Sequence, residues 1–275
     1  MGRAGERSSG RIGQALARAR SEGRVALIAY LTAGYPEPEA TPGLVQALVD
    51  GGADAVELGI PFSDPLADGA TIQRASWRAL EAGMTTGRCL KLVRELRNKG
   101  VVIPLIVMTY YNPILAYGQD VFVQDAAAAG VDGLIAVDVP PEEAEELAAR
   151  CRAGGLDLIP LLAPTSTDER IALAARQASG FLYCVSVAGV TGARETLPPD
   201  LGAFLQRVRQ QTELPLAVGF GISRREHVEA LRGQADAAIV GSAIVDVIEA
   251  SPRDEREVRV REYVEVLTGR REARA

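Results

Sequence analysis

The chain has 275 residues, 47% of them apolar, and a formal net charge of −6. This length allows one large domain or two small ones, and α/β barrels commonly reach it as a single domain. Basic residues form no block with interleaved aromatics outside the termini, which disfavours a nucleic-acid partner. No apolar run approaches the length of a membrane-spanning helix, so no membrane association is predicted.

The N-terminal segment, the cysteines and the single histidine limit the location and the types of active site that the sequence predicts. The first twenty residues carry scattered arginines and no apolar segment, so they do not read as a secretory signal. Cys89, Cys151 and Cys184 show no CxxC spacing, which fits a reduced, cytoplasmic compartment. The only histidine, His227, lies in a predicted helix and is expected to be solvated. A catalytic triad and a metal site are therefore disfavoured, and acid–base work is expected from carboxylates and tyrosines.

Short apolar runs alternate with amphipathic stretches along the whole chain, after a leading helix predicted over Arg11–Ser21. The runs predicted as strands are Val25–Leu31, Ala55–Leu58, Ile103–Val107, Gly133–Val137, Leu156–Leu161, Phe181–Val185, Leu216–Val218 and Ala237–Val240. The helices predicted between and after them are Pro38–Asp50, Thr86–Lys99, Gln119–Ala129, Glu142–Ala153, Asp168–Gln177, Asp200–Gln211, Arg224–Arg232 and Ile244–Glu249. This alternation implies parallel pairing, and continuously apolar strands imply burial on both faces. We therefore predict an α/β fold, a (β/α)₈ TIM barrel with an extra N-terminal helix.

The barrel is predicted to be a single domain over residues 1–275, because no interior linker interrupts the pattern. Residues 1–10 and roughly 252–275 are candidates for fraying, and a solvated last helix is the alternative for the charged tail from Ser251. A recurring Ala-Gly-x-Asp pattern, as in residues 129–132, is interpreted as turn chemistry between a helix and the next strand.

The stretch from Ala53 to Asp68 contains a carboxylate inside an apolar strand. Desolvating a carboxylate is costly, so Glu57 near the strand's C-terminal end is a site candidate with a pKa expected to be raised by burial. The alternative is a strand-end glutamate that reaches solvent. The C-terminal ends of barrel strands and their loops build active sites, so Glu57 is expected to point into the barrel mouth, with Asp68 in the following loop.

Two further regions are rich in glycine. The loop from Tyr183 to Arg194 suggests either a mobile lid with backbone amides for an anion or a plain surface loop. Glycine turns also follow the seventh and eighth strands, at Gly219-Phe-Gly221 and Gly241-Ser242. Each turn leads into a helix N-terminus that favours anions, so a phosphate site is predicted there.

Several segments together resemble the tryptophan synthase alpha subunit family. The longest and most specific is Glu57-Leu-Gly-Ile-Pro-Phe-Ser-Asp-Pro-Leu-Ala-Asp-Gly69. The others are Thr32-Ala-Gly34, Gly189-Val-Thr-Gly192, Val218-Gly-Phe-Gly-Ile-Ser223 and Gly241-Ser-Ala-Ile244. The resemblance covers roughly residues 11 to 250, in the right order and spacing.

The resemblance implies a lyase of tryptophan biosynthesis that cleaves indole-3-glycerol phosphate, by a retro-aldol reaction, to indole and glyceraldehyde 3-phosphate. It assigns general acid–base catalysis to Glu57 and binding of the indole N–H to Asp68. It also assigns residues around them: Tyr183 and Phe220 to the substrate cavity, Thr191 to loop closure over Asp68, and Gly192, Gly221, Gly241 and Ser242 to the phosphate.

The same resemblance implies a β-subunit partner in an αββα heterotetramer with allosteric coupling. Pyridoxal phosphate is expected in that partner and no cofactor in this chain, with Asp64 and Pro65 as interface candidates. Two alternatives stay open, a free-standing lyase and a phosphate-binding regulatory subunit. The sequence departs from many members at Tyr35 and from some at Val187-Ala188, which puts loop closure or signalling to the partner in question.

Overall fold

The structure is a computed structural model that describes residues 10–186, 198–219 and 221–272. Its strands are all parallel and form one sheet in the order β5-β4-β3-β2-β1-β9-β8-β7-β6. They span β1 Ala26–Thr32, β2 Ala55–Gly59, β3 Leu105–Thr109, β4 Gly133–Ala136, β5 Asp157–Leu158, β6 Leu161–Leu162, β7 Leu182–Val185, β8 Leu216–Gly219 and β9 Ala237–Val240.

The two edge segments of this sheet, β5 and β6, are consecutive in the chain and act as one interrupted strand. The Ile159 amide donates to the Leu134 carbonyl of β4 at 3.0 Å, and the Pro160 carbonyl accepts from the Tyr183 amide of β7 at 3.1 Å. The segment between β5 and β6 therefore touches both neighbours, and it closes the sheet into a barrel of eight strand positions. The predicted (β/α)₈ barrel is confirmed.

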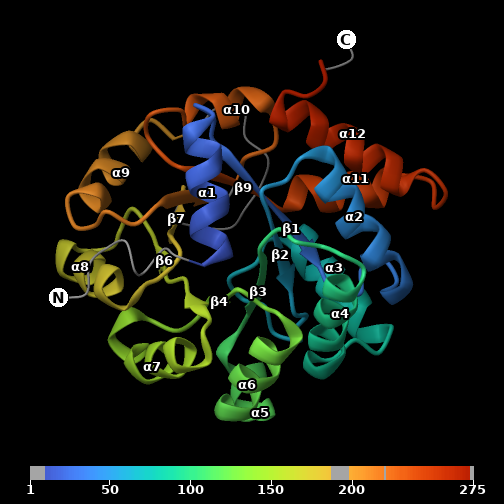
Figure 1. The fold of residues 1–275 in the computed structure, drawn as a ribbon, viewed down its shortest axis with the longest axis horizontal. Helices are drawn as coiled ribbons and strands as arrows, with labels where there is room; N and C mark the ends of the chain where they lie inside the picture. The colour runs from blue at the N-terminus through green and yellow to red at the C-terminus, as the bar shows by residue number, and fades with distance from the viewer. Residues whose placement is uncertain (1–9, 187–197, 220, 273–275) are drawn as a thin grey trace.

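Helices surround the strands, and α1 lies across one end of the barrel (Figure 1). The α-helices span α1 Arg11–Ser21, α2 Thr41–Gly51, α3 Ala70–Glu81, α4 Thr86–Asn98, α5 Tyr111–Tyr117, α6 Gln119–Ala129, α7 Glu145–Gly154, α8 Asp168–Gln177, α9 Leu201–Arg209, α10 Arg225–Ala230, α11 Ser242–Ala250 and α12 Arg256–Thr268, with short 3₁₀ turns at Pro38–Ala40 and Pro141–Glu143. Within the described residues, none of these helices is long and apolar enough to cross a membrane.

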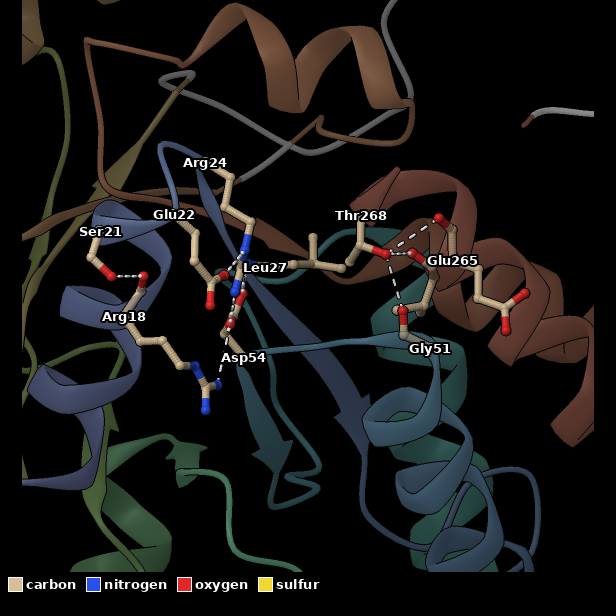
Figure 2. A network of polar contacts seen from close by, with 10 residues as sticks. Arg18, Ser21, Glu22, Arg24, Leu27, Gly51, Asp54, Glu265 and Thr268 are labelled. Atoms are coloured by element: carbon tan, nitrogen blue, oxygen red, sulfur yellow. Dashed lines mark hydrogen bonds and ion pairs between the residues drawn. The ribbon is translucent and has the colours of Figure 1, made fainter. Parts of the chain in front are cut away.

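The charged tail forms the helix α12, so the alternative of a frayed end does not hold over residues 256–268. Val260, Val264 and Leu267 are buried, and α12 packs against α2. The Thr268 hydroxyl donates to the Gly51 carbonyl at the end of α2 at 3.0 Å, as Figure 2 shows. The apolar positions of an otherwise charged segment thus supply the contact that fixes it.

At the N-terminal ends of the strands, a buried aspartate joins α1, β1 and β2 (Figure 2). Asp54 is 2% exposed and precedes β2. It accepts from the Leu27 amide of β1 at 2.9 Å and from both terminal nitrogens of Arg24 at 2.6 and 2.8 Å. Arg18 of α1 lies 3.6 Å from the same carboxylate. The carboxylate is therefore paired and hydrogen-bonded, as burial of a charge requires.

Two further aspartates repeat this arrangement around the barrel. Asp132, ahead of β4, accepts from the Leu105 amide of β3 at 2.8 Å and contacts Arg97 and Arg11. Asp236, ahead of β9, accepts from the Leu216 amide of β8 at 2.8 Å and contacts Arg209 at 2.7 Å. These aspartates thus do more than reverse the chain, since each ties its own strand to the first or second residue of the neighbouring strand.

Replacing Asp54 by alanine should lower the free energy of unfolding by about 2–4 kcal/mol, because the Leu27 amide and the Arg24 guanidinium lose their buried partner. Urea unfolding measures the change. Asp50→Ala is the matched control, since the exposed Asp50 side chain accepts a hydrogen bond from the neighbouring Gln46 at 2.8 Å, and it should stay within about 0.5 kcal/mol of wild type. Equal losses in the two variants would contradict a clamping role for Asp54.

Candidate active site

Glu57 lies in the middle of β2, between β1 and β3, with Tyr30 and Ile106 as its register neighbours. Its side chain is 1% exposed, and its Oε2 atom has no hydrogen-bond partner among the described residues. Burial, with a smaller contribution from the charge of Asp68, raises the pKa of Glu57 to about 8. The sequence left open whether Glu57 is buried or reaches solvent, and in the structure it is buried.

Asp68 belongs to the loop between β2 and α3, and it folds back so that its side chain is only 9% exposed. The Tyr110 hydroxyl donates to its Oδ2 atom at 3.2 Å. Burial raises the pKa of Asp68 to about 6, and the hydrogen bond from Tyr110 opposes this rise. The main chain at Asp68 is held by Gln73 of α3, whose amide nitrogen donates to the Asp68 carbonyl at 2.9 Å.

Both carboxyl groups line one pocket at the C-terminal end of the barrel. The other residues lining the pocket are Tyr30, Gly69, Ile72, Met108, Tyr183, Gly221, Ile222, Ile239, Gly241 and Ser242. The apolar and aromatic members give the pocket a surface suited to a flat, largely apolar ring, and the two acids supply polar groups inside it. The structure thus brings together Glu57, Asp68 and Tyr183, which the sequence analysis singled out.

Two tyrosines lie against glycines of the neighbouring strands. A Cβ atom on Gly59 would lie 2.2 Å from the Tyr30 Oη atom, and one on Gly219 would lie 2.2 Å from the Tyr183 Oη atom. Neither distance leaves room for a side chain, so these glycines allow the tyrosine hydroxyls to lie over β2 and β8. The Tyr30 hydroxyl also forms a hydrogen bond of 3.1 Å with the Thr32 hydroxyl.

Three of the predicted phosphate residues, Gly221, Gly241 and Ser242, line the same pocket. Gly221 has a φ of +84°, which favours glycine, and Ser242 is the first residue of α11. The N-terminus of α11 therefore lies at the pocket, where its amides and dipole favour an anion. Three predicted site residues, Thr191, Gly192 and Phe220, lie outside the described residues, as do Val187 and Ala188.

The interface candidates Asp64 and Pro65 lie outside the pocket, on the surface of the loop that carries Asp68. Asp64 is exposed and accepts a hydrogen bond from the Ser63 hydroxyl. Next to them, Leu66 is 90% exposed, an unusual degree for a leucine. Pro65 borders a surface groove together with Tyr35.

Sequence reasoning missed two residues of this region and misplaced a third. The two missed residues are Tyr30, which lines the pocket, and Tyr110, which bonds to Asp68. The sequence offered one signal for them, the general expectation that tyrosines take part in the chemistry. His227 was expected to be solvated, which is wrong, because it is 4% exposed and its Nδ1 atom accepts from the Ser223 amide at 3.3 Å. The helix α12 packs against α10 and Tyr263 bonds the Ser223 carbonyl, which encloses this turn.

The described residues contain no group of three or more histidine, cysteine, aspartate or glutamate side chains arranged to hold a metal ion. The three cysteines are buried free thiols. Among the described residues that line the pocket, the polar side chains are the carboxyls of Glu57 and Asp68 and the hydroxyls of Tyr30, Tyr183 and Ser242.

Comparison with known proteins points to one family. A family model described as tryptophan synthase alpha chain matches residues 16–273. The tryptophan synthase alpha chain of Roseiflexus castenholzii is 54% identical over 259 residues, covering 94% of this chain and 99% of that protein. That of Chloroflexus aggregans is 52% identical over 257 residues, covering 94% and 96%.

Solved structures agree with the sequence comparison. The crystal structure of tryptophan synthase subunit alpha from Legionella pneumophila str. Paris has a TM-score of 0.87 and 38% identity, covering 94% of this chain and 97% of that one. A crystal structure of tryptophan synthase from M. tuberculosis in an aminoacrylate-bound form has a TM-score of 0.84 and 35% identity, covering 94% and 98%. The chain belongs to the tryptophan synthase alpha chain family, which catalyses the cleavage of indole-3-glycerol phosphate, a lyase reaction.

Proposed function

We propose that Glu57 and Asp68 are the catalytic pair with which this chain cleaves indole-3-glycerol phosphate to indole and glyceraldehyde 3-phosphate. The observation that supports this assignment is that two buried carboxyl groups line one pocket and differ in acidity, with a pKa of about 8 for Glu57 and about 6 for Asp68. Near neutral pH, Glu57 then holds its proton and Asp68 is largely ionised. Such a pair supplies one acid and one anion at the same pH.

In the proposed first step, protonated Glu57 gives its proton to C3 of the indole ring. Positive charge then develops at the ring nitrogen, and the carboxylate of Asp68 accepts the N–H and balances that charge. An acid with a pKa near the working pH is the most effective donor, because it is both protonated and able to give up its proton.

In the second step, the carboxylate form of Glu57 takes the proton of the hydroxyl on the carbon bonded to C3. The carbon–carbon bond breaks as the carbonyl of glyceraldehyde 3-phosphate forms, and the electron pair returns to the ring to give indole. Glu57 ends protonated, as it began, so one residue serves as acid and then as base.

We further propose that the pocket holds the substrate along its length. Tyr183 would pack against the indole ring, and Gly221, Gly241 and Ser242 would bind the phosphate at the N-terminus of α11. Phe220, Thr191 and Gly192 keep the roles that the family resemblance implies, as predictions.

We propose a β subunit as the partner, in an αββα complex whose β subunit carries pyridoxal phosphate and uses indole, with Asp64 and Pro65 at the interface. A Saccharomyces cerevisiae protein described as tryptophan synthase supports a larger assembly, since this chain matches it at 46% identity but over only 37% of its length. The exposed Leu66 beside both candidates offers an apolar contact. A cytoplasmic location is part of the same proposal.

The deciding experiment measures indole release from indole-3-glycerol phosphate by the purified chain, alone and with an added tryptophan synthase β subunit. Turnover that rises with the β subunit supports the partnered lyase. Equal turnover in both cases favours a free-standing lyase, and binding of the substrate without turnover in either case favours a regulatory subunit.

Glu57→Gln should lower kcat by about 10²–10⁴-fold or more, since it removes a general acid that also serves as base. Affinity for glycerol phosphate should be unchanged, because Glu57 is not among the residues proposed to bind the phosphate. Steady-state assays and calorimetry measure the two effects, with Glu143→Gln at an exposed position as the control. A Glu57→Gln enzyme within threefold of wild type would remove this residue from the mechanism.

Asp68→Asn should be similarly impaired, because a neutral amide cannot balance the charge at the ring nitrogen. Its effect should appear in kcat for lyase turnover, while glycerol phosphate still binds as it does to wild type. Loss of glycerol phosphate binding in this variant would instead place Asp68 at the phosphate.

The raised pKa of Glu57 also predicts a pH effect on stability. Between its ordinary value of 4.5 and the folded-state value of about 8, the folded chain keeps a proton that the unfolded chain has released. The free energy of unfolding of wild type should therefore fall as pH rises across this window. Glu57→Gln lacks this titration, so relative to wild type it should gain stability by on the order of 4–5 kcal/mol between about pH 4.5 and pH 8 and above, and the two should converge toward pH 4.5.

Urea unfolding at a series of pH values measures this difference, and the exposed Glu143→Gln variant supplies the baseline. Glu57→Gln and wild type showing the same stability at every pH would mean that Glu57 titrates as a solvated carboxyl.

A further inference from the structure

Tyr110 lies where β3 ends and α5 begins, outside the set of residues that line the pocket. It is 6% exposed and packs its ring against Phe62, with the ring centroids 5.1 Å apart. Phe62 belongs to the loop that follows β2 and carries Asp68. Tyr110 therefore connects the end of a barrel strand to this loop.

The hydroxyl of Tyr110 makes two hydrogen bonds to that loop. It accepts from the Ala67 amide at 2.9 Å and donates to the Oδ2 atom of Asp68 at 3.2 Å. A phenol that accepts from an amide has its proton free to point at the carboxylate, so the two bonds reinforce each other. The bonds fix both the backbone just before Asp68 and one oxygen of its carboxylate.

The loop needs such a tie because its outer part is solvent-exposed. Ser63, Asp64, Leu66 and Ala67 are exposed, whereas Asp68 is buried. Other hydrogen bonds of the loop near Asp68 have main-chain acceptors, among them the bond from the Asp68 amide to the Pro65 carbonyl at 3.0 Å and the bond from Gln73 to the Asp68 carbonyl. Among the side-chain contacts of Asp68 that the structure describes, Tyr110 supplies the hydrogen bond.

We propose that Tyr110 is a positioning residue that orients the Asp68 carboxylate toward the substrate's ring nitrogen and favours its ionised form. This inference rests on the proposed role of Asp68. A hydrogen bond donated to a carboxylate stabilises the charged state, which counters the burial that raises the pKa of Asp68. Burial, with the charge of Asp68 as a lesser cause, raises the pKa of Tyr110 itself, so its hydroxyl stays protonated and remains a donor.

Tyr110→Phe is the test, because phenylalanine keeps the ring against Phe62 and removes only the hydroxyl. Tyr117→Phe is the matched control, since the Tyr117 hydroxyl also donates to an aspartate, Asp125, at 2.6 Å, but away from the pocket. Tyr110→Phe should lower kcat for indole release about tenfold, the loss expected for one hydrogen bond to a charged group, with a smaller change in KM. Tyr117→Phe should leave both parameters unchanged.

Two readouts separate positioning from a merely structural role. The acidic limb of the pH–rate profile should move to higher pH by about one unit in Tyr110→Phe, because Asp68 becomes harder to ionise. Carbon-13 NMR titration of the Asp68 carboxyl should show the same upward shift without any assay of activity. A Tyr110→Phe enzyme whose profile and Asp68 titration match those of Tyr117→Phe would overturn the inference, even if its thermal stability falls.

The experiment also distinguishes this inference from the proposed function. If Asp68→Asn is inactive while Tyr110→Phe behaves as wild type, only the positioning role fails. If Asp68→Asn retains full activity, the proposed role of Asp68 fails, and the inference about Tyr110 falls with it.

Discussion

Glu57 holds a carboxyl group inside a barrel whose neighbouring side chains are mostly apolar or aromatic, and its Oε2 atom has no hydrogen-bond partner among the described residues. A buried carboxyl of this kind is tolerated chiefly in its protonated form, which is the form a general acid needs. At a pH where a solvated glutamate would be ionised, burial of Glu57 lowers the free energy of unfolding. The surrounding structure must therefore be stable enough to carry this cost, and it must keep water from solvating the acid.

The stabilising contacts lie at the other end of the strands. Asp54, Asp132 and Asp236 each accept from a backbone amide at the first or second residue of a neighbouring strand and contact an arginine. Helix α1 adds Arg18 and Arg11 to two of these carboxylates. These carboxyl groups are paired with arginines and hydrogen-bonded to backbone amides, whereas the Oε2 atom of Glu57 has no hydrogen-bond partner among the described residues. Such a division, with stabilising contacts at the N-terminal ends and chemistry at the C-terminal ends, is general for barrels of this type. In this chain the paired aspartates at the N-terminal ends supply stability that offsets the cost of burying Glu57 nearer the other end.

A feature could be predicted from the sequence where the residues that determine it are close together in the chain, and not where they are far apart. The alternation of apolar runs predicted the barrel, because each unit is local, and the single acid in an apolar run identified Glu57. Tyr30 was missed because a tyrosine in a strand is ordinary, and only the pairing of β1 with β2 places it beside Glu57. Tyr110 was missed for a similar reason, since its partner Asp68 lies 42 residues earlier in the chain. His227 was misplaced because helix periodicity does not show that α12 covers α10.

The glycines after the strands show why a sequence signal can have two physical causes. Gly219 belongs to a turn interpreted as an anion site, yet a Cβ there would lie 2.2 Å from the Tyr183 hydroxyl. Gly59 stands in the same relation to Tyr30. Both glycines are thus required by an aromatic wall of the pocket, whether or not a phosphate binds. Gly221, unlike Gly219, lines the pocket, and its positive φ favours glycine whether or not a phosphate binds. The proposed phosphate site therefore depends on Gly221 and on the start of α11 more than on Gly219.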